Sequence, residues 1–347
     1  MPLDTPIRIT AGRLRGFVER ALVAVGVPWV DATIVADCLL MANLSGVDSH
    51  GVVRLSHYVQ RIENGTINPK PNVSHQHPAP SLALLDGDDG LGHVVTFGAC
   101  TEAMAMARET GIGMVAIRNS SHFGMTGFYI YRLVQQGFIG MAMTDTDAFL
   151  IPFGGRQPFF GTNPLAIGFP TRGIPIILDM ATTSVPYGKI ALAKAEGLPI
   201  PPDWGLDSAG DPTTDPNAVV GLHPIAGPKG SGLAMVIDIL CSVLTGLAWG
   251  PNINKMYEQI DEPRRIGHVI MAIDAQRLMP IEAFTQRLDE MLQAFHDVPP
   301  AEGHQQVYYP GELEGLRRRE RSVKGIPIDA GLEAELTALG ERLGVAF

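Results

Sequence analysis

Cysteine is scarce in this chain of 347 residues, and its three cysteines, Cys38, Cys100 and Cys241, lie far apart. An odd number of widely spaced cysteines builds neither a disulfide framework nor a CxxC metal pair, and this pattern is typical of proteins from a reducing compartment. No HExxH spacing accompanies the histidines, so a zinc site is not expected. We therefore expect a cytoplasmic protein without a bound metal.

Basic residues are outnumbered, because 26 Lys and Arg stand against 36 Asp and Glu and give a formal net charge of −10. Nucleic-acid binding needs a basic face for the phosphates, so we expect no nucleic-acid partner. Long apolar runs are also missing, apart from GLAMVIDILCSVLTGLAW at 232–249. That run contains Asp238 and is barely long enough to span a bilayer, so it predicts a buried helix and no membrane partner.

Hydrophobic residues make up 46% of the chain, which is enough for a large core, and their pattern changes near residue 80. Upstream, helical spacing predicts two helices within 10–45, separated at Gly26–Pro28, and a third over 51–63. The segment 66–80 holds four prolines and predicts a connector. Downstream, the predicted strands are 113–117, 138–144, 165–171, 174–181 and 269–275, and the predicted helices are 96–110, 186–197, 281–296 and a last one near the C-terminus. The sum indicates an α/β or α+β core with a helical N-terminal part.

The glycine fingerprint of dinucleotide-binding proteins is absent from its usual context. The match GIGMVA at 111–116 follows a predicted helix and leads into a strand. A Rossmann turn runs in the opposite order, from a strand through the glycines into a helix. We therefore interpret the match as accidental, and any nicotinamide cofactor must bind on another scaffold. A GxSxG nucleophile elbow is also missing, which weakens a hydrolase interpretation.

Two other segments place polar groups where a ligand can bind. AGPKGSG at 226–232 precedes the long apolar helix, so its glycines, the helix N-terminus and Lys229 form a candidate phosphate site. The alternative is a flexible loop with one solvated lysine. RNSSHFGMTG at 118–127 follows a predicted strand and contains His122, and such loops often bind ligands in α/β proteins. Here the alternative is that Ser120 or Ser121 caps the next helix.

Asp179 ends the apolar run IILDM, where an unpaired carboxylate is costly. It can accept hydrogen bonds from a ribose, or it can cap the helix that follows. Lys189 lies ten residues later in YGKIALAKA and can equally be a solvated charge on that helix.

The segment SGVDSHGVVRLSHYV at 45–59 places Ser49, His50 and Arg54 within six positions. Arginine suits a bidentate grip on a carboxylate, and the ordinary pKa of histidine suits proton transfer near neutral pH. Ser49 can orient the imidazole. The alternative is a capped helix start with two solvated side chains, and the segment alone leaves both interpretations open.

Taken together, the motifs match one family. SGVDSHGVVRLSHYV, RNSSHFGMTG, IPFGG, FFGTNPLAIGFP, ILDMATT, GKI, TTDP and GPKGSGL occur in an order that resembles the malate/L-lactate dehydrogenase family of NAD(P)-dependent oxidoreductases. That family is distinct from the Rossmann-type lactate and malate dehydrogenases, and the resemblance covers nearly the whole chain. The tail QQVYYPGELEGLRRRERSVKGIPI looks most like the ureidoglycolate dehydrogenase branch, although Phe123 stands where that branch has serine.

The resemblance implies an L-sulfolactate/malate dehydrogenase-like fold. We expect a non-Rossmann cofactor domain with a mainly antiparallel sheet over 76–296, including a small inserted subdomain. A helical domain of 1–75 and 297–347 is expected to hold the Ser-His/Arg segment and the C-terminal tail. The resemblance also implies a homodimer.

The resemblance further implies roles for individual residues. His50 is the expected acid/base residue with Ser49 beside it, His122 is its rival near the nicotinamide, and Arg54 and Thr162 are expected to bind a small carboxylate substrate. The residues expected to bind the dinucleotide are His122, Phe123, Gly124, Met125, Thr126, Thr146, Asp179, Met180, Ala181, Lys229, Pro310, Gly311 and Glu312.

Lys189 completes the candidate catalytic set and bears on the substrate. The cyclic-imine reductases of the family have an aspartate at this position, which completes a Ser–His–Asp relay. A lysine cannot be the anionic partner, so a 2-hydroxy acid of the ureidoglycolate, malate or lactate type is favoured. Reduction of a cyclic imine or a 2-keto acid is the alternative, and a non-catalytic dinucleotide-binding protein is the remote one.

The cofactor is expected to be NAD or NADP. An acidic group near the ribose 2′ position selects NAD, and a basic group selects NADP. Asp145, Asp147 and Asp179 are the candidate acidic groups, so NAD is favoured.

Overall fold

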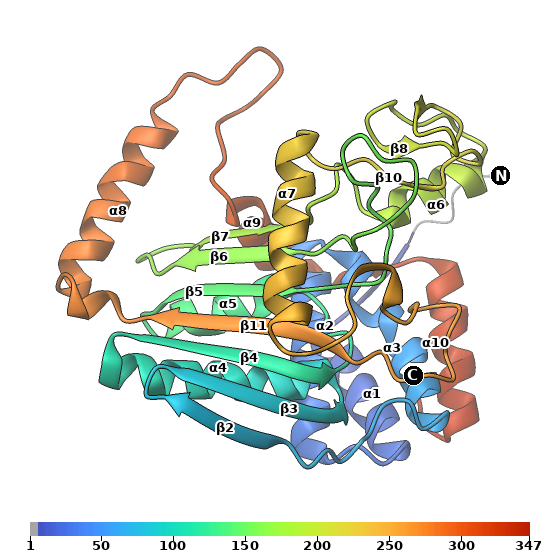
Figure 1. Ribbon diagram of the computed structural model, residues 1–347, viewed down its shortest axis with the longest axis horizontal. Helices are drawn as coiled ribbons and strands as arrows, with labels where there is room; N and C mark the ends of the chain where they lie inside the picture. Colours follow the sequence, from blue (N-terminus) through green and yellow to red (C-terminus); the bar gives the residue numbers. More distant parts are fainter. Residues whose placement is uncertain (1–5) are drawn as a thin grey trace.

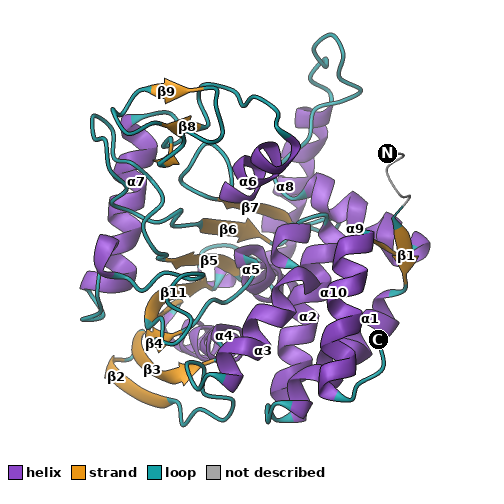
Figure 2. Ribbon diagram, turned by 90° about the vertical axis from the view of Figure 1, so that its right-hand side faces the viewer, coloured by secondary structure: helices purple, strands orange, loops and turns teal. Residues whose placement is uncertain are grey.

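Helices from both ends of the chain form one layer of the molecule (Figure 2). The structure, a computed structural model, describes residues 6–347. The layer consists of α1 (Ala11–Ala24), α2 (Trp29–Ser45), α3 (Leu55–Glu63), α9 (Glu312–Lys324) and α10 (Ala330–Leu343). The short strands β1 (Ile7–Ile9) and β12 (Ile326–Ile328) pair antiparallel and tie the two ends together. Thr10 caps α1 by accepting a hydrogen bond from the Arg13 backbone N–H.

A seven-stranded sheet forms the centre of the molecule, in the order β2-β3-β4-β11-β5-β6-β7 (Figure 1). Its strands are β2 (Ser74–Ala79), β3 (Leu82–Gly90), β4 (Ile112–Ser120), β5 (Ile139–Thr144), β6 (Leu165–Phe169), β7 (Ile176–Met180) and β11 (Ile266–Ile273). The β3–β4 pair is parallel and the other pairs are antiparallel. The expected mainly antiparallel, non-Rossmann sheet is therefore confirmed.

Helices cover the two faces of this sheet unequally. One face packs against α4 (Gly92–Thr110) and α5 (Thr126–Gln135) around a core that includes Leu85, Val115 and Ile270. The opposite face packs against α7 (Pro228–Asp238) and the π-helical turn Ile239–Val243 that continues it. Figures 1 and 2 show α7 on the side of the sheet away from the helical layer.

Two further parts extend from the sheet. A small subdomain contains α6 (Tyr187–Glu196) and the short strands β8 (Gly205–Leu206), β9 (Pro212–Thr213) and β10 (Gly221–Leu222). The amphipathic helix α8 (Ile281–His296) projects from the body and has no buried residue (Figure 1). Within residues 6–347, no helix combines the length and apolar content that crossing a membrane requires.

Several predicted elements differ from the structure. The predicted connector 66–80 contains strand β2. The strand can include Pro78 because β2 is an edge strand, where the missing backbone N–H of proline is tolerated. The glycine-rich segment 226–232 is not a loop throughout, since α7 begins at Pro228. The C-terminal region holds two helices instead of one. The division into two domains, 1–75 with 297–347 and 76–296, stays a prediction. Residues 1–5 of the first domain lie outside the described residues.

Candidate active site

A cavity of about 970 Å³ lies where the sheet meets the helical layer. It is at the upper end of the range for small-molecule and cofactor sites. Segments far apart in the chain line it: the turns around His50, the loop 122–127, the ends of β5 and β7, the start of α6, the segment around Tyr257 and the turn 308–311.

Two 3₁₀ turns, Asp48–His50 and Val52–Arg54, present the Ser49, His50 and Arg54 side chains to this cavity. The Asn43 side chain on α2 accepts a hydrogen bond from the Val52 backbone N–H at 2.9 Å. It packs against Gly51 so closely that a Cβ there would lie 2.2 Å from its oxygen. Ser49 Oγ lies 3.0 Å from His50 Nδ1, which orients the imidazole ring. These contacts fix the two turns that carry Ser49, His50 and Arg54. The helix predicted over 51–63 begins only at Leu55.

The Arg54 guanidinium is available for an anionic ligand. Its Nε donates to the Ser49 carbonyl at 2.6 Å, and Nη1 contacts the Tyr257 hydroxyl. Among residues 6–347, no carboxylate forms an ion pair with it. A half-buried guanidinium whose neighbours are neutral is a suitable carboxylate site.

His122 lies beside His50 in the same cavity. The two rings stack with their centroids 5.8 Å apart, and Nδ1 of His122 lies 2.7 Å from the buried Tyr58 hydroxyl. Gly124, two residues on, has a φ of +77°, and a Cβ there would lie 2.8 Å from both Cys38 Sγ and His93 Nε2. Glycine is therefore needed for the loop to hold His122 in this position.

Burial lowers the pKa of both histidines. Desolvation and then the positive charge of Arg54 lower the pKa of His50 to about 4. Desolvation lowers the pKa of His122 well below its ordinary value, and His50 and Arg54 add to this effect. Both rings are therefore neutral at neutral pH and able to accept a proton.

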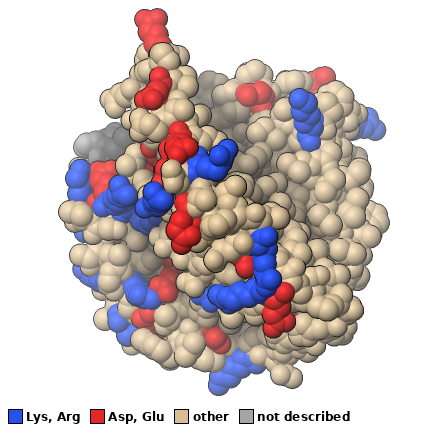
Figure 3. All heavy atoms as spheres, turned by 90° about the vertical axis from the view of Figure 1, so that its left-hand side faces the viewer, with Lys and Arg blue, Asp and Glu red and all other residues tan. Residues whose placement is uncertain are grey.

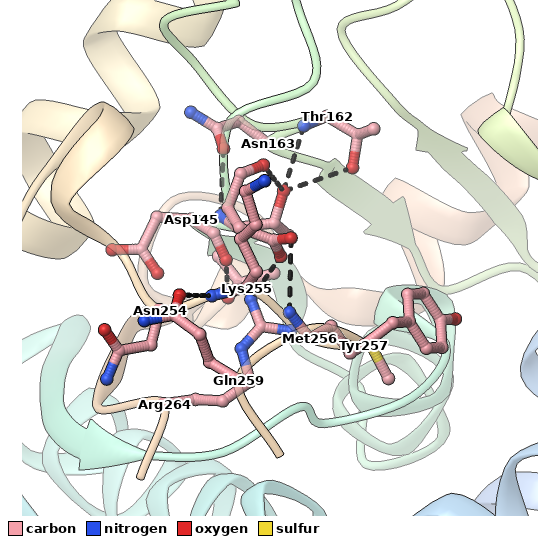
Figure 4. Close-up of polar contacts among 12 residues, drawn as sticks. Asp145, Thr162, Asn163, Asn254, Lys255, Met256, Tyr257, Gln259 and Arg264 are labelled. Atoms are coloured by element: carbon pink, nitrogen blue, oxygen red, sulfur yellow. Dashed lines mark hydrogen bonds and ion pairs between the residues drawn. The ribbon is translucent and has the colours of Figure 1, made fainter. Parts of the chain in front are cut away.

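Arg264, labelled in Figure 4, forms a buried ion pair with Asp147, and both residues line the cavity. Arg264 Nη2 lies 2.5 Å from Asp147 Oδ1, and the Met256 backbone N–H donates to Asp147 Oδ2 at 3.3 Å. The two side chains are 2% and 5% exposed, so the charges neutralise each other out of water. Nε of Arg264 has no hydrogen-bond partner among the described residues.

The residues expected to meet the dinucleotide mostly line this cavity, namely His122, Phe123, Gly124, Met125, Thr126, Thr146, Asp179, Met180, Ala181, Pro310 and Gly311. Thr162, the expected substrate residue, lines it too. Thr162 N donates to Thr146 Oγ1 at 3.0 Å, and Thr146 N donates to the Asn163 side chain at 3.0 Å (Figure 4). A Cβ added at Gly188 would meet no atom within 4 Å, so the backbone there borders open space. An extended cavity with such backbone access fits a dinucleotide.

Asp179 lies on β7, and one of its two predicted alternatives needs correction. Its Oδ2 accepts a hydrogen bond from the Gly127 backbone N–H at 2.7 Å. Gly127 is in the first turn of α5, so Asp179 caps α5 and not the helix that follows it in sequence. Desolvation raises the pKa of Asp179 to about 6. The carboxyl also lines the cavity, where it can meet a ribose.

Several predicted residues lie away from the cavity. Lys189 is exposed on α6, with Nζ 5.5 Å from the centre of the Trp204 ring. Lys229 is exposed at the start of α7 and does not line the cavity. Glu312 is buried behind the Pro310–Gly311 turn, accepting a hydrogen bond from Tyr309 N at 3.2 Å. Asp145 is fully buried, bonded to Gly267 N at 3.0 Å, and desolvation raises its pKa to about 7. Asp145 therefore cannot meet a ribose.

The alternative that Ser120 or Ser121 caps the next helix is wrong. The N-cap residue of α5 is Met125, and neither serine hydrogen-bonds to a backbone N–H in the first turn of that helix. Ser120 Oγ instead lies 2.9 Å from His268 Nε2, and Ser121 Oγ accepts a hydrogen bond from Gly92 N at 3.0 Å. Both serines therefore tie the chain just before His122 to neighbouring segments by hydrogen bonds.

Tyr58, Tyr257 and Arg264 are site residues that the sequence motifs did not reveal. Tyr58 had a usable signal, because it is four residues after Arg54 and therefore on the same side of a helix. Tyr257 and Arg264 come from a segment without a motif, and only the fold brings them beside Arg54.

Comparison with known proteins agrees with this geometry. The family model described as "Malate/L-lactate dehydrogenase" matches residues 9–337. The chain is 36% identical to the NAD⁺ ureidoglycolate dehydrogenase of Escherichia coli K12, over 93% of each chain. It is 34% identical to the NADP⁺ (2R)-3-sulfolactate dehydrogenase of Chromohalobacter salexigens, over 87% of this chain and 89% of that one. The solved malate dehydrogenase of Pyrococcus horikoshii superimposes with a TM-score of 0.90 at 34% identity, covering 99% and 97% of the two chains. This chain therefore belongs to the malate/L-lactate dehydrogenase family of NAD(P)-dependent 2-hydroxy-acid dehydrogenases.

Proposed function

We propose that the chain transfers a hydride between C2 of a small 2-hydroxy acid and C4 of a nicotinamide. The main support is the position of the Arg54 guanidinium, which has no carboxylate partner among residues 6–347, in one cavity with two neutral imidazoles. A guanidinium fixes a carboxylate, and a neutral imidazole next to it can take the proton of the adjacent hydroxyl. The substrates named for the relatives, ureidoglycolate and sulfolactate among them, are acids of this kind.

The proposed chemistry assigns the proton to His50. Arg54 holds the substrate carboxylate, and the hydroxyl proton passes to the His50 ring, which Ser49 orients through Nδ1. The bound nicotinamide supplies the hydride acceptor. Holding all the groups in one cavity contributes to the rate through orientation. Tyr58 holds Nδ1 of His122 in the same way as Ser49 holds Nδ1 of His50. We assign the proton to His50 because its turn adjoins that of Arg54, and we assign His122 a supporting role against the nicotinamide.

We propose NAD as the preferred cofactor, because Asp179 lines the cavity and can accept a hydrogen bond from a ribose hydroxyl. Its carboxylate would repel a 2′-phosphate. Glu312 does not line the cavity and can act only through the Pro310–Gly311 turn, and Lys229, which does not line it either, has no part in this proposal. Paired titrations with NADH and NADPH test this assignment: tighter binding of NADH supports it, and tighter binding of NADPH overturns it.

The proposed reaction is tested by a substrate panel. NAD⁺ and NADP⁺ reduction is measured with ureidoglycolate, malate, lactate and sulfolactate, and NADH and NADPH oxidation with pyruvate, oxaloacetate and piperideine-2-carboxylate. Turnover of a 2-hydroxy acid and its keto acid supports the proposal. Turnover of the cyclic imine alone favours the imine reductase, and dinucleotide binding without any turnover favours a non-catalytic protein.

The lowered histidine pKa values predict an unusual pH profile for oxidation. The value of kcat/KM reports the free enzyme, where His50 has a pKa of about 4. Because the depressed pKa keeps the ring neutral at lower pH, the acid limb should lie near pH 4 and not near the ordinary histidine value of about 6.5. We expect kcat/KM for 2-hydroxy-acid oxidation to stay level from about pH 5.5 to neutrality. A limb near pH 6.5 would contradict the assigned environment of His50.

We propose that the enzyme acts as a homodimer that covers the α7 side of the sheet. Met114, Met141 and Leu165 remain partly exposed there, and the neighbouring side chains of Val243 and Leu244 are 52% and 60% exposed. In Figure 3 the half of the surface toward α7 carries few charged side chains. A large uncharged apolar face is typical of an obligate interface between identical chains.

The homodimer is tested by sedimentation. The wild-type chain should sediment with twice the mass of one chain, and Leu244→Asp should shift it toward the monomer. Val323→Asp, a change at an 88% exposed position on α9, is the control that should leave the mass unchanged. A monomeric wild-type chain would exclude the homodimer.

A further inference from the structure

Arg61 is a fully buried arginine that no step above uses. It lies on α3, seven residues after Arg54, and only 1% of it is exposed. Its guanidinium has no carboxylate in hydrogen-bond contact among the described residues, although burying such a charge is costly. Burial lowers its pKa to about 10. A residue that remains buried at this cost needs a structural or functional reason.

The partners of Arg61 are mostly backbone carbonyl groups of a single segment, Asn254–Pro263, which we call the 254–263 loop. Nη2 donates to the carbonyl oxygens of Met256 at 2.7 Å, Gln259 at 3.2 Å and Lys255 at 3.3 Å. Nη1 donates to the Glu262 carbonyl at 3.0 Å, and Nε donates to His57 Nε2 at 3.0 Å. One guanidinium thus gathers four carbonyl groups of one loop.

The loop also has ties of its own. The Asn254 side chain donates to the Pro263 carbonyl at 2.9 Å, and Lys255 N donates to the Gln259 side chain at 2.8 Å. Asn254, Lys255 and Gln259 lie together beside Arg264 in Figure 4. Thr66, after α3, donates to the Ile260 carbonyl at 3.2 Å. The loop is therefore docked on the C-terminal end of the helix that follows Arg54.

The docked loop reaches the cavity at two points. Tyr257 contacts the Arg54 guanidinium through its hydroxyl, and the Arg54 Cζ lies 5.8 Å from the centre of the tyrosine ring. Met256 donates its backbone N–H to Asp147, the partner of Arg264. Tyr257 is about half exposed, and its ring packs against His57 with the two ring centroids 5.4 Å apart, so the loop and His57 together place it.

We propose that Arg61 is a positioning residue that sets the 254–263 loop so that Tyr257 orients Arg54 for the substrate carboxylate. Arg61 lies about two helical turns beyond Arg54 and does not line the cavity. It acts through the loop and through Tyr257. This inference rests on the proposed carboxylate-binding function of Arg54.

The test is a double-mutant cycle of Arg61→Lys and Tyr257→Phe, with Arg15→Lys as the control. Arg15 lies on helix α1, forms an ion pair with Glu19 at 3.1 Å and does not line the cavity. Lysine keeps the charge but cannot reach four carbonyl groups in a fork. We expect Arg61→Lys to raise KM for the 2-hydroxy acid by about tenfold, with the dinucleotide Kd unchanged. The control should change neither value.

The cycle distinguishes positioning from general stability. If Arg61 acts through Tyr257, the double variant should have nearly the same KM as Arg61→Lys alone. Two fold-changes that multiply, or a KM for Arg61→Lys equal to that of the control, would overturn the proposal. If Arg61→Lys does not fold, Thr66→Val takes its place in the cycle. That change removes the hydrogen bond from the Thr66 hydroxyl to the Ile260 carbonyl, and we expect the same rise in KM.

A second readout does not depend on the reaction. Hydrogen exchange of the backbone amides in the 254–263 loop should speed up in Arg61→Lys and stay unchanged in Arg15→Lys. If no 2-hydroxy acid is oxidised by the wild-type chain, the proposed function fails while the exchange still tests the docking role. Unchanged exchange in Arg61→Lys overturns the positioning role whatever the substrate.

Discussion

Replacing His50 by alanine should lower kcat for 2-hydroxy-acid oxidation by about 10²- to 10⁴-fold, the range for loss of a general base. His50 is expected to take the hydroxyl proton, and nothing else on the Asp48–His50 turn can replace its imidazole. The Kd of the dinucleotide should stay within about twofold, because the expected dinucleotide contacts come from other segments. Single-turnover kinetics together with a dinucleotide titration give both quantities.

Two controls separate the roles of the two histidines. Ser49→Ala should lower kcat by much less than His50→Ala, because it removes only the group that orients the ring. His122→Ala should affect the dinucleotide Kd as well as kcat. Near wild-type turnover in His50→Ala, with turnover abolished in His122→Ala, would show that the two roles are reversed.

Replacing Arg54 by leucine should lower kcat/KM by roughly 30- to 5,000-fold, which corresponds to the loss of about 2–5 kcal/mol that is usual when one partner of a buried charge pair is removed. The loss should appear mainly in KM, since the guanidinium is proposed to hold the substrate carboxylate in both the ground state and the transition state. Arg54→Lys should recover only part of it, because an ammonium group cannot grip a carboxylate with two parallel bonds. Steady-state kinetics of the two variants measure both effects.

The matched comparison for Arg54 is a substrate without the carboxylate. For the corresponding primary amide, wild type and Arg54→Leu should have similar kcat/KM values. A large Arg54 effect on the amide would mean that the guanidinium stabilises the cavity and does not bind the carboxylate.

Much of the fold could be predicted because apolar periodicity is a local property. The helices that begin at Ala11 and Trp29 and the strands β4 and β5 lie close to their predicted ranges, because each buries a regular apolar face. Strand β2 was missed because it is an exposed edge strand, SHQHPA, without an apolar face. Its pairing with β3 defines it, and a linear pattern does not contain that information.

The same limit applies to the site. The motif around His50 and Arg54 predicted their neighbourhood, since a short turn fixes the side chains relative to one another. Arg61 and Tyr257 are almost 200 residues apart, and they become linked only when the 254–263 loop folds onto α3. Lys189 and Lys229 illustrate the reverse case, because they sit in motif segments but lie outside the cavity lining.

Direct transfer of hydrogen from the substrate to the nicotinamide is the most direct test of the proposed reaction. The enzyme is incubated with NAD⁺, or NADP⁺ if that binds more tightly, and with the best 2-hydroxy acid of the panel deuterated at C2. The reduced nicotinamide is then analysed by NMR and mass spectrometry. We predict one deuterium at C4 of the nicotinamide and none in the solvent. Reduced nicotinamide that contains only protium, or no reduction with any 2-hydroxy acid, would contradict hydride transfer from C2.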